Sequence, residues 1–153
     1  MSLIIDNRGK NNALFVCGPT CFTKTNPAEV AGANAPYGVL GGTVAALSGT
    51  KDFEVVPGDG TLMSVGLFLN NAEGAPFENA PAVASGKVTV ISGMPSVRVD
   101  IYAAGVTFAI GDKLYSDANG YLTNVESANK QVIGICTKVP SAADPYLALE
   151  MAI

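Results

Sequence analysis

The sequence has no histidine and no tryptophan, and the missing histidine limits catalysis most. Histidine is the most common general base, and Ser-His-Asp and Cys-His arrangements both require it. Asp59, Asp112 and Asp117 stand in turn sequences, where an aspartate side chain bonds its own backbone. A phosphate-binding Gly-Lys-Ser/Thr motif is also missing, because Gly9-Lys10 is followed by Asn11. We therefore predict that the protein is not an enzyme and holds no cofactor.

Charge is scarce as well. Charged residues make up 14% of the chain, against roughly 25% in typical soluble domains. The net charge is −4 and no basic run occurs, which excludes an ordinary nucleic-acid binder. No apolar run approaches the ~18 residues of a membrane helix. Leu3-Ile4-Ile5 is followed at once by Asp6, unlike a secretory signal, so we expect synthesis in a cytoplasm.

The three cysteines are an odd number, which argues against a disulfide framework. Cys17 and Cys21 have the spacing of a metal clip, but a structural zinc site usually needs four ligands. Only Cys136 remains to join them, and there is no histidine. We predict that no metal is bound and that the thiols are buried and inert, with metal or redox roles as lesser alternatives.

Seventeen glycines and nine prolines divide the chain into short segments, many with alternating apolar residues. This pattern is typical of short strands joined by turns. The sequence predicts an all-β fold, a small β-barrel or sandwich domain over residues 37–153. Residues 39–47 fit either a glycine-weakened strand or a short helix. The expected strands cover residues 13–17, 53–55, 63–69, 87–91, 97–101, 106–110, 132–139 and 147–153.

The stretch 108–122 predicts a hairpin at the centre of this domain. Val106, Phe108 and Ile110 alternate with polar or small residues, as in a half-buried strand. Leu114 and Leu122 then flank a turn, residues 117–120, whose Asn-Gly pair tolerates the positive φ of hairpin turns. We interpret this stretch as scaffold.

Residues 1–36 differ, because glycine, proline and asparagine interrupt them repeatedly. We predict an extended, irregular N-terminal arm that lies on a partner, and a loosely held terminus is equally compatible. An arm of this kind can add a strand to a neighbour's exposed sheet edge. The residues expected to contact a partner are Leu3, Ile4, Ile5, Arg8, Phe22 and Tyr37.

The second half carries a recognisable order of motifs. They are Gly111-Asp-Lys-Leu-Tyr115, Asn119-Gly-Tyr-Leu122, Ile133-Gly-Ile135, and Asp144 before Leu147-Ala-Leu-Glu150. This order resembles the C-terminal part of the capsid decoration (cement) proteins of tailed bacteriophages. The resemblance covers about Ala104 to Met151, and Cys136 takes a place where a small residue is usual in that family.

The resemblance implies a virion structural protein, made in the bacterial host cytoplasm and located on the capsid surface. It would bind the outer face of a shell of HK97-type major capsid proteins, bridge neighbouring capsomers and stabilise the expanded head, commonly as a homotrimer. The alternatives are a phage tail or baseplate β-domain and a host-surface carbohydrate-binding module. The last would need exposed rings, for which Tyr102, Tyr115 and Tyr121 are the candidates.

Overall fold

The computed structural model describes residues 3–5, 11–17, 38–69, 72–73 and 87–153. These residues form strands and connecting loops, with no helix among them, so the all-β prediction is confirmed. The described part accordingly has no helix that is long and apolar enough to cross a membrane. The strands are β1 Leu3–Ile5, β2 Asn11–Cys17, β3 Gly38–Val39, β4 Val44–Leu47, β5 Glu54–Pro57, β6 Ser64–Phe68, β7 Ala72–Glu73, β8 Lys87–Ser92, β9 Ser96–Val99, β10 Lys113–Ser116, β11 Leu122–Thr123, β12 Gly134–Lys138 and β13 Leu147–Met151.

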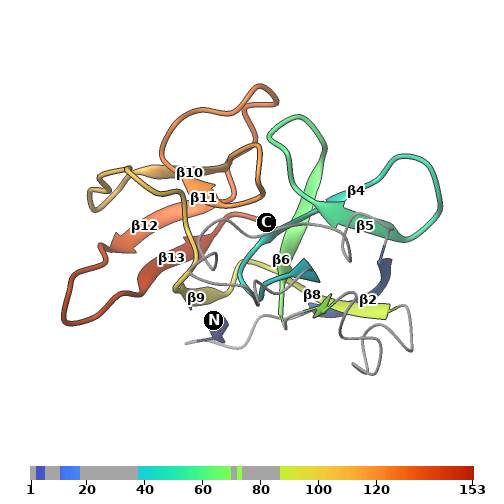
Figure 1. The fold of residues 1–153 in the computed structure, drawn as a ribbon, viewed down its shortest axis with the longest axis horizontal. Coiled ribbons are helices and arrows are strands. Elements are labelled where there is room, and N and C mark those ends of the chain that lie inside the picture. The colour runs from blue at the N-terminus through green and yellow to red at the C-terminus, as the bar shows by residue number, and fades with distance from the viewer. Residues whose placement is uncertain (1–2, 6–10, 18–37, 70–71, 74–86) are drawn as a thin grey trace, which may run out of the picture.

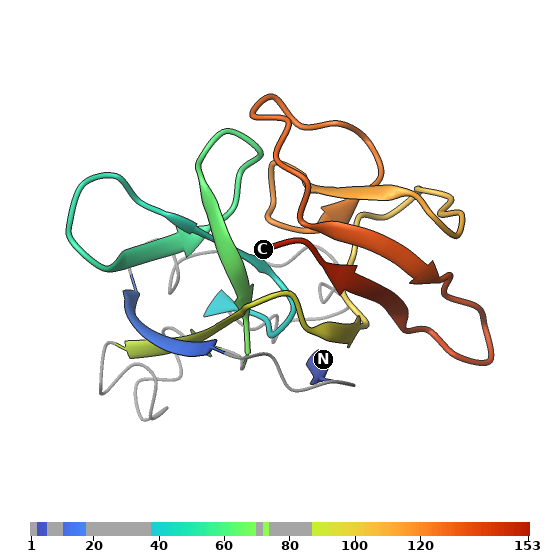
Figure 2. The same ribbon diagram turned by 180° about the vertical axis from the view of Figure 1, so that it is seen from behind.

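The strands form a small closed barrel and a six-stranded sheet beside it (Figure 1). The barrel order is β2-β5-β4-β6-β8, closed by the pairing of β8 with β2, and the pair β2 with β5 is parallel. The sheet is antiparallel throughout, in the order β1-β9-β13-β12-β10-β11. Strands β3 and β7 form a separate two-stranded ladder. Figure 2 shows from behind how β8 of the barrel leads through a short turn into β9 of the sheet.

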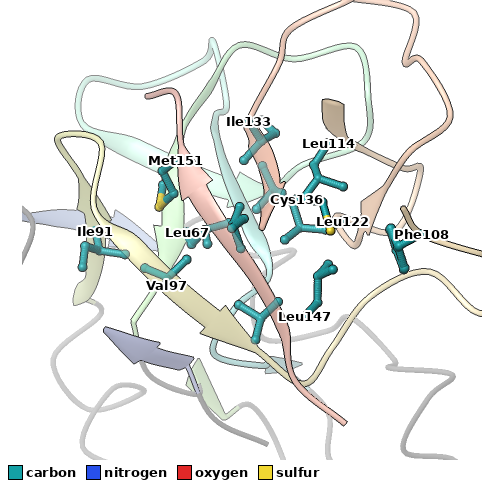
Figure 3. Packing of buried hydrophobic residues seen from close by; sticks show 13 residues of the cluster. Leu67, Ile91, Val97, Phe108, Leu114, Leu122, Ile133, Cys136, Leu147 and Met151 are labelled. Atoms are coloured by element: carbon teal, nitrogen blue, oxygen red, sulfur yellow. The ribbon is translucent and has the colours of Figure 1, made fainter. Parts of the chain in front are cut away.

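The barrel wall is buried on both faces where it meets the sheet. Ala45, Phe68 and Val90 belong to a small cluster with residues of β3, β5 and β8. Their chain neighbours Val44, Leu67 and Ile91 belong to a larger cluster that contains the apolar residues of β9, β10, β12 and β13 (Figure 3). Successive residues of a strand point to opposite faces, so each of β4, β6 and β8 contributes to both clusters. Because apolar clusters lie on both faces of the barrel wall, the fold buries many of the apolar residues of the chain.

Two segments of the predicted N-terminal arm are strands of these sheets. Leu3, Ile4 and Ile5 pair with Val99, Arg98 and Val97 of β9. Strand β2 pairs with β8 over Asn11 to Val16 and with the start of β5, so it is a wall of the barrel. The description of residues 1–36 as an irregular arm therefore does not apply to residues 3–5 and 11–17. The rest of that segment lies outside the described residues.

The central hairpin forms only in its second part. Strands β10 and β11 pair around the turn at residues 117–120, where Gly120 has a φ of 79°. The predicted strand over residues 106–110 is wrong, because that segment is a loop. Side chains satisfy its backbone groups: Asp112 Oδ2 accepts from Ala109 N at 2.8 Å, and Asn124 Nδ2 donates to Thr107 O at 3.0 Å.

The other strand predictions are close to the observed strands. The ambiguous segment 39–47 is two strands, β3 and β4, separated by a turn. Met63 is exposed and lies before β6 rather than on a buried face. A register shift between β4 and β6, where Ala45 faces Gly66 and Ala46 faces Ser64, breaks the simple alternation predicted for residues 63–69.

The polar connection before β12 fastens the sheet to the barrel. We call residues 127–131 the clasp. Gln131 donates from Nε2 to Ser64 O at 2.8 Å and accepts at Oε1 from Ser64 N at 2.7 Å. Asn129 donates from Nδ2 to Leu62 O at 2.7 Å and from its backbone N to Gly60 O at 2.9 Å. The clasp thus takes the role of a neighbouring strand along residues 60–64.

Replacing Gln131 with alanine is expected to lower the free energy of unfolding by about 1–3 kcal/mol, because both backbone groups of buried Ser64 lose this partner. Urea unfolding measures the change. Glu126→Gln, at an exposed side chain in the same connection, is the control and should change it by less than about 0.5 kcal/mol. Equal effects of the two substitutions would show that the clasp adds nothing.

Candidate functional site

The residues predicted to contact a partner are only partly within the described structure. Leu3, Ile4 and Ile5 form β1, whose backbone pairs with β9 of the same chain. Arg8, Phe22 and Tyr37 lie outside the described residues. The structure therefore places three of the six at one edge of the six-stranded sheet and does not bring the set together.

The two described cysteines lie in different sheets. Cys17 ends β2, Cys21 lies outside the described residues, and Cys136 is a buried free thiol of β12. Burial, followed by the negative charge of Asp112, raises the pKa of the Cys136 thiol above its usual value. A raised pKa disfavours the nucleophilic thiolate. Among the described residues no cluster of three or more histidine, cysteine or acidic side chains suits a metal ion.

The aspartates singled out in the sequence hold turns, as predicted. Asp59 Oδ1 accepts from Thr61 N at 2.8 Å and from Leu62 N at 2.9 Å. Asp117 Oδ1 accepts from Asn119 N and Tyr121 N, both at 2.8 Å. Burial acts to raise the pKa of Asp59, but hydrogen bonds from Leu62 and Thr61 outweigh it and the pKa is lowered. Such carboxylates are fixed as acceptors for their own backbone.

A groove of about 360 Å³ opens between these turns. Carboxylates and hydroxyls contribute to its lining, but the carboxyl groups of Asp59 and Asp117 already accept the turn hydrogen bonds. The buried hydroxyl of Ser116 donates to Asp117 O at 3.1 Å. The groove is therefore a gap framed by rigid turns. Its polar lining residues are Asp59, Ser116, Asp117, Thr123, Glu126 and Ser127.

The three tyrosines considered as a sugar platform do not form one. Tyr115 and Tyr121 are buried. Tyr102 packs edge to face on Phe108, with ring centroids 5.6 Å apart, and its hydroxyl donates to Pro145 O at 3.1 Å. A sugar-binding platform needs an exposed ring face.

Large apolar side chains are exposed at one end of the barrel. Leu47 ends β4, Phe53 precedes β5 and Met63 precedes β6, and all three are exposed. Leu47 N donates to Met63 O at 2.9 Å, and Ser48 N donates to Glu54 O at 3.0 Å, so the three segments are neighbours. We call Leu47, Phe53 and Met63 the hairpin-tip patch.

The backbone at Phe53 is in the left-handed region, with a φ of 57°. This conformation costs an L-residue with a side chain about 1–2 kcal/mol. The Phe53 side chain is also 74% exposed, so burial does not offset that cost. Strain of this kind at an exposed apolar residue is typical of positions with a role other than stability.

A buried carboxylate holds the loop that carries Phe53. Glu54 is 5% exposed, and its Oε1 accepts from Thr50 Oγ1 at 3.2 Å. Its Oε2 lies 3.9 Å from Lys51 Nζ. Ser48 Oγ accepts from Thr50 N at 3.2 Å. The loop 48–53 is thus fixed by its own polar side chains, and Phe53 is displayed on a preorganised support.

The sequence interpretation missed this patch, because it placed Phe53 and Met63 in alternating strands. The signal was present in Ser48-Gly-Thr-Lys-Asp52, five turn-forming or charged residues that lead directly into a bulky apolar one. Comparison of the chain with protein-family models and with curated proteins finds no match. The site therefore has to be interpreted from its own geometry.

An ion pair at the β12–β13 loop is expected to make the free energy of unfolding depend on pH. Asp144 Oδ2 lies 2.9 Å from Lys138 Nζ, and Asp144 Oδ1 accepts from Tyr146 N at 3.2 Å. The bond to Lys138 first, and then the one from Tyr146, lowers the pKa of Asp144. Between the lowered pKa and the ordinary pKa of an aspartate, the unfolded state binds more protons than the folded state. The contribution of Asp144 to the free energy of unfolding is therefore present at neutral pH and is lost as the pH falls through the lowered pKa.

Asp144→Asn is therefore expected to lower the urea midpoint at about pH 7 and to have a smaller effect at about pH 2, where the wild-type carboxyl is also neutral. Urea unfolding of both proteins at the two pH values measures the difference. High salt should also reduce the effect at neutral pH, because the pair is solvent-accessible. An effect of equal size at both pH values would contradict this role.

Proposed function

We propose that the protein is a virion decoration protein that binds the outer face of an HK97-type capsid shell and bridges neighbouring capsomers as a homotrimer. The observation that carries the proposal is where the motifs that resemble those of decoration proteins lie in the fold. The residues of Gly111–Tyr115, Asn119–Leu122, Ile133–Ile135 and Leu147–Glu150 supply the turns and strands of one antiparallel unit, β10 to β13. Forming turns and strands is a structural role, and it fits a domain that acts by binding a shell.

The surface chemistry supports adhesion rather than turnover. The chain has few charges, and its hairpin-tip patch exposes three large apolar side chains, of which Phe53 lies on a fixed loop. Charge depletion and apolar enrichment are typical of the centres of protein interfaces. The aspartates highlighted in the sequence bond their own turns, which supports a structural role for them.

The proposed mechanism is physical. One contact to a capsid subunit contributes modest affinity, and simultaneous contacts to two or three subunits raise the effective affinity by orders of magnitude. A protein that binds the expanded shell and not the compact one stabilises the expanded form by mass action. The protein would be made in the bacterial host cytoplasm and then stay on the capsid surface.

Co-sedimentation with expanded, undecorated shells tests the proposal. We expect saturable binding with a fixed number of copies per shell and a higher temperature of shell disruption after binding. Compact precursor shells are the matched control and should retain little protein. Absence from the shell pellet at near-saturating concentration, or copurification with tails instead, would refute the proposal.

A further inference from the structure

We propose that the hairpin-tip patch is a contact between copies of this chain, with Phe53 as its apolar centre and Lys51 of one copy facing Asp52 of the next. The inference rests on the proposed function only for the homo-oligomeric assembly to which it assigns a surface. Its test is separate from shell binding.

The apolar part of the argument is the gathering of three exposed side chains. Leu47, Phe53 and Met63 come from adjacent segments that backbone hydrogen bonds hold together. Phe53 stands out from the barrel in a left-handed conformation on a loop fixed by Glu54. A preorganised aromatic side chain loses little freedom on association, and aromatic residues are enriched among those that dominate binding energy.

The charges beside Phe53 favour a second copy as the occupant. Lys51 and Asp52 are consecutive, exposed and opposite in sign, and they lie at the tip of the loop. A surface that carries both signs around an apolar centre is complementary to itself. In a cyclic assembly each copy presents Lys51 to one neighbour and Asp52 to the other, so the charges pair around the axis. A strongly basic partner would repel Lys51, and a strongly acidic one would repel Asp52.

Sedimentation velocity of the full chain over a range of concentrations tests the proposal. The wild type is expected to self-associate, and Phe53→Ser should raise its dissociation constant by about tenfold or more, as loss of an anchor worth over 1 kcal/mol does. Ile110→Ser is the matched control, because Ile110 is also 74% exposed but lies in the 106–112 loop beside the six-stranded sheet. It should leave the dissociation constant unchanged. Circular dichroism and urea unfolding verify that both variants fold.

A double-mutant cycle identifies the pairing between copies. Lys51→Gln alone and Asp52→Asn alone should each weaken association by about threefold, the effect of an exposed ion pair. The charges are removed rather than exchanged because Lys51 Nζ also lies 3.9 Å from Glu54 Oε2 of its own chain. The double variant should associate no more weakly than Lys51→Gln alone, because both substitutions remove the same contact between copies.

The outcomes separate the two proposals. A wild-type chain that stays monomeric at every concentration, a Phe53→Ser variant that associates like wild type, or an equal loss with Ile110→Ser would each overturn this inference. So would a Phe53→Ser variant that assembles normally but no longer binds shells, since the patch would then face the capsid. Self-association that depends on Phe53, in a protein that binds no shell, would support the inference and refute only the decoration function.

Discussion

Leu67→Ala is expected to lower the free energy of unfolding by about 2–5 kcal/mol, the usual cost of removing a fully buried leucine side chain. Leu67 has no exposed surface, and it lies in β6 of the barrel. Its side chain belongs to the larger cluster, with Val97, Leu149 and Met151 of the six-stranded sheet (Figure 3). The cavity would therefore open at the junction of barrel and sheet and weaken both.

Urea unfolding observed in two ways tests this coupling. Tyr102, Tyr115, Tyr121 and Tyr146 lie in or beside the six-stranded sheet, so tyrosine fluorescence reports mainly on that part, and far-ultraviolet circular dichroism reports on both. We expect the same lowered midpoint with both signals. Val125→Ala, at an exposed side chain, is the control and should cost less than about 0.5 kcal/mol. An unshifted tyrosine transition would show that the sheet unfolds independently of the barrel.

The β10–β11 hairpin could be predicted because its signals are local. Asp117 and Gly120 lie within four residues of each other, and the turn they form depends only on their own hydrogen bond and φ. The parallel pair of the barrel could not be predicted in the same way. β2 and β5 are parallel and about 40 residues apart in the chain, and which distant strands pair is decided by packing rather than by local sequence.

The errors have a common physical origin. Alternation predicts a strand only if a neighbour supplies the hydrogen bonds, and at residues 106–110 the side chains of Asp112 and Asn124 supply them instead. Phe108 is buried there and Ile110 is not, although both fit the same pattern. Phe53 fits a strand pattern as well, but its positive φ turns it out of the strand. The alternation of apolar residues reveals neither the side-chain hydrogen bonds to the loop nor the positive φ.

The candidate site could not be predicted from the sequence for a related reason. A patch formed by Leu47, Phe53 and Met63 exists only because β4 pairs with both β5 and β6, which brings three chain segments to one end of the barrel. Each residue alone resembles an ordinary core residue. Only the exposure of the side chain distinguishes a patch residue from a core residue, and exposure is a property of the folded barrel.

Gly66→Ala is expected to have the other large effect, because the backbones of β6 and β8 approach each other at this position. A Cβ on Gly66 would overlap the carbonyl oxygen of Ile91 and lie 2.7 Å from Val90 Cγ1. Backbone atoms of a paired strand cannot move aside cheaply, so β6 and β8 would have to separate. We expect a loss of at least about 3 kcal/mol, at the upper end for overpacking substitutions.

Gly49→Ala separates this steric effect from the general cost of replacing a glycine. Gly49 has a φ of 73°, and a Cβ there would meet nothing within 4 Å. The control should therefore lose only about 1 kcal/mol, the cost of alanine in a left-handed conformation. Urea unfolding of both variants measures the two losses. Because β6 lies between β4 and β8 in the closed barrel, a Gly66→Ala loss no greater than that of Gly49→Ala would mean that the barrel does not close through this pair of strands.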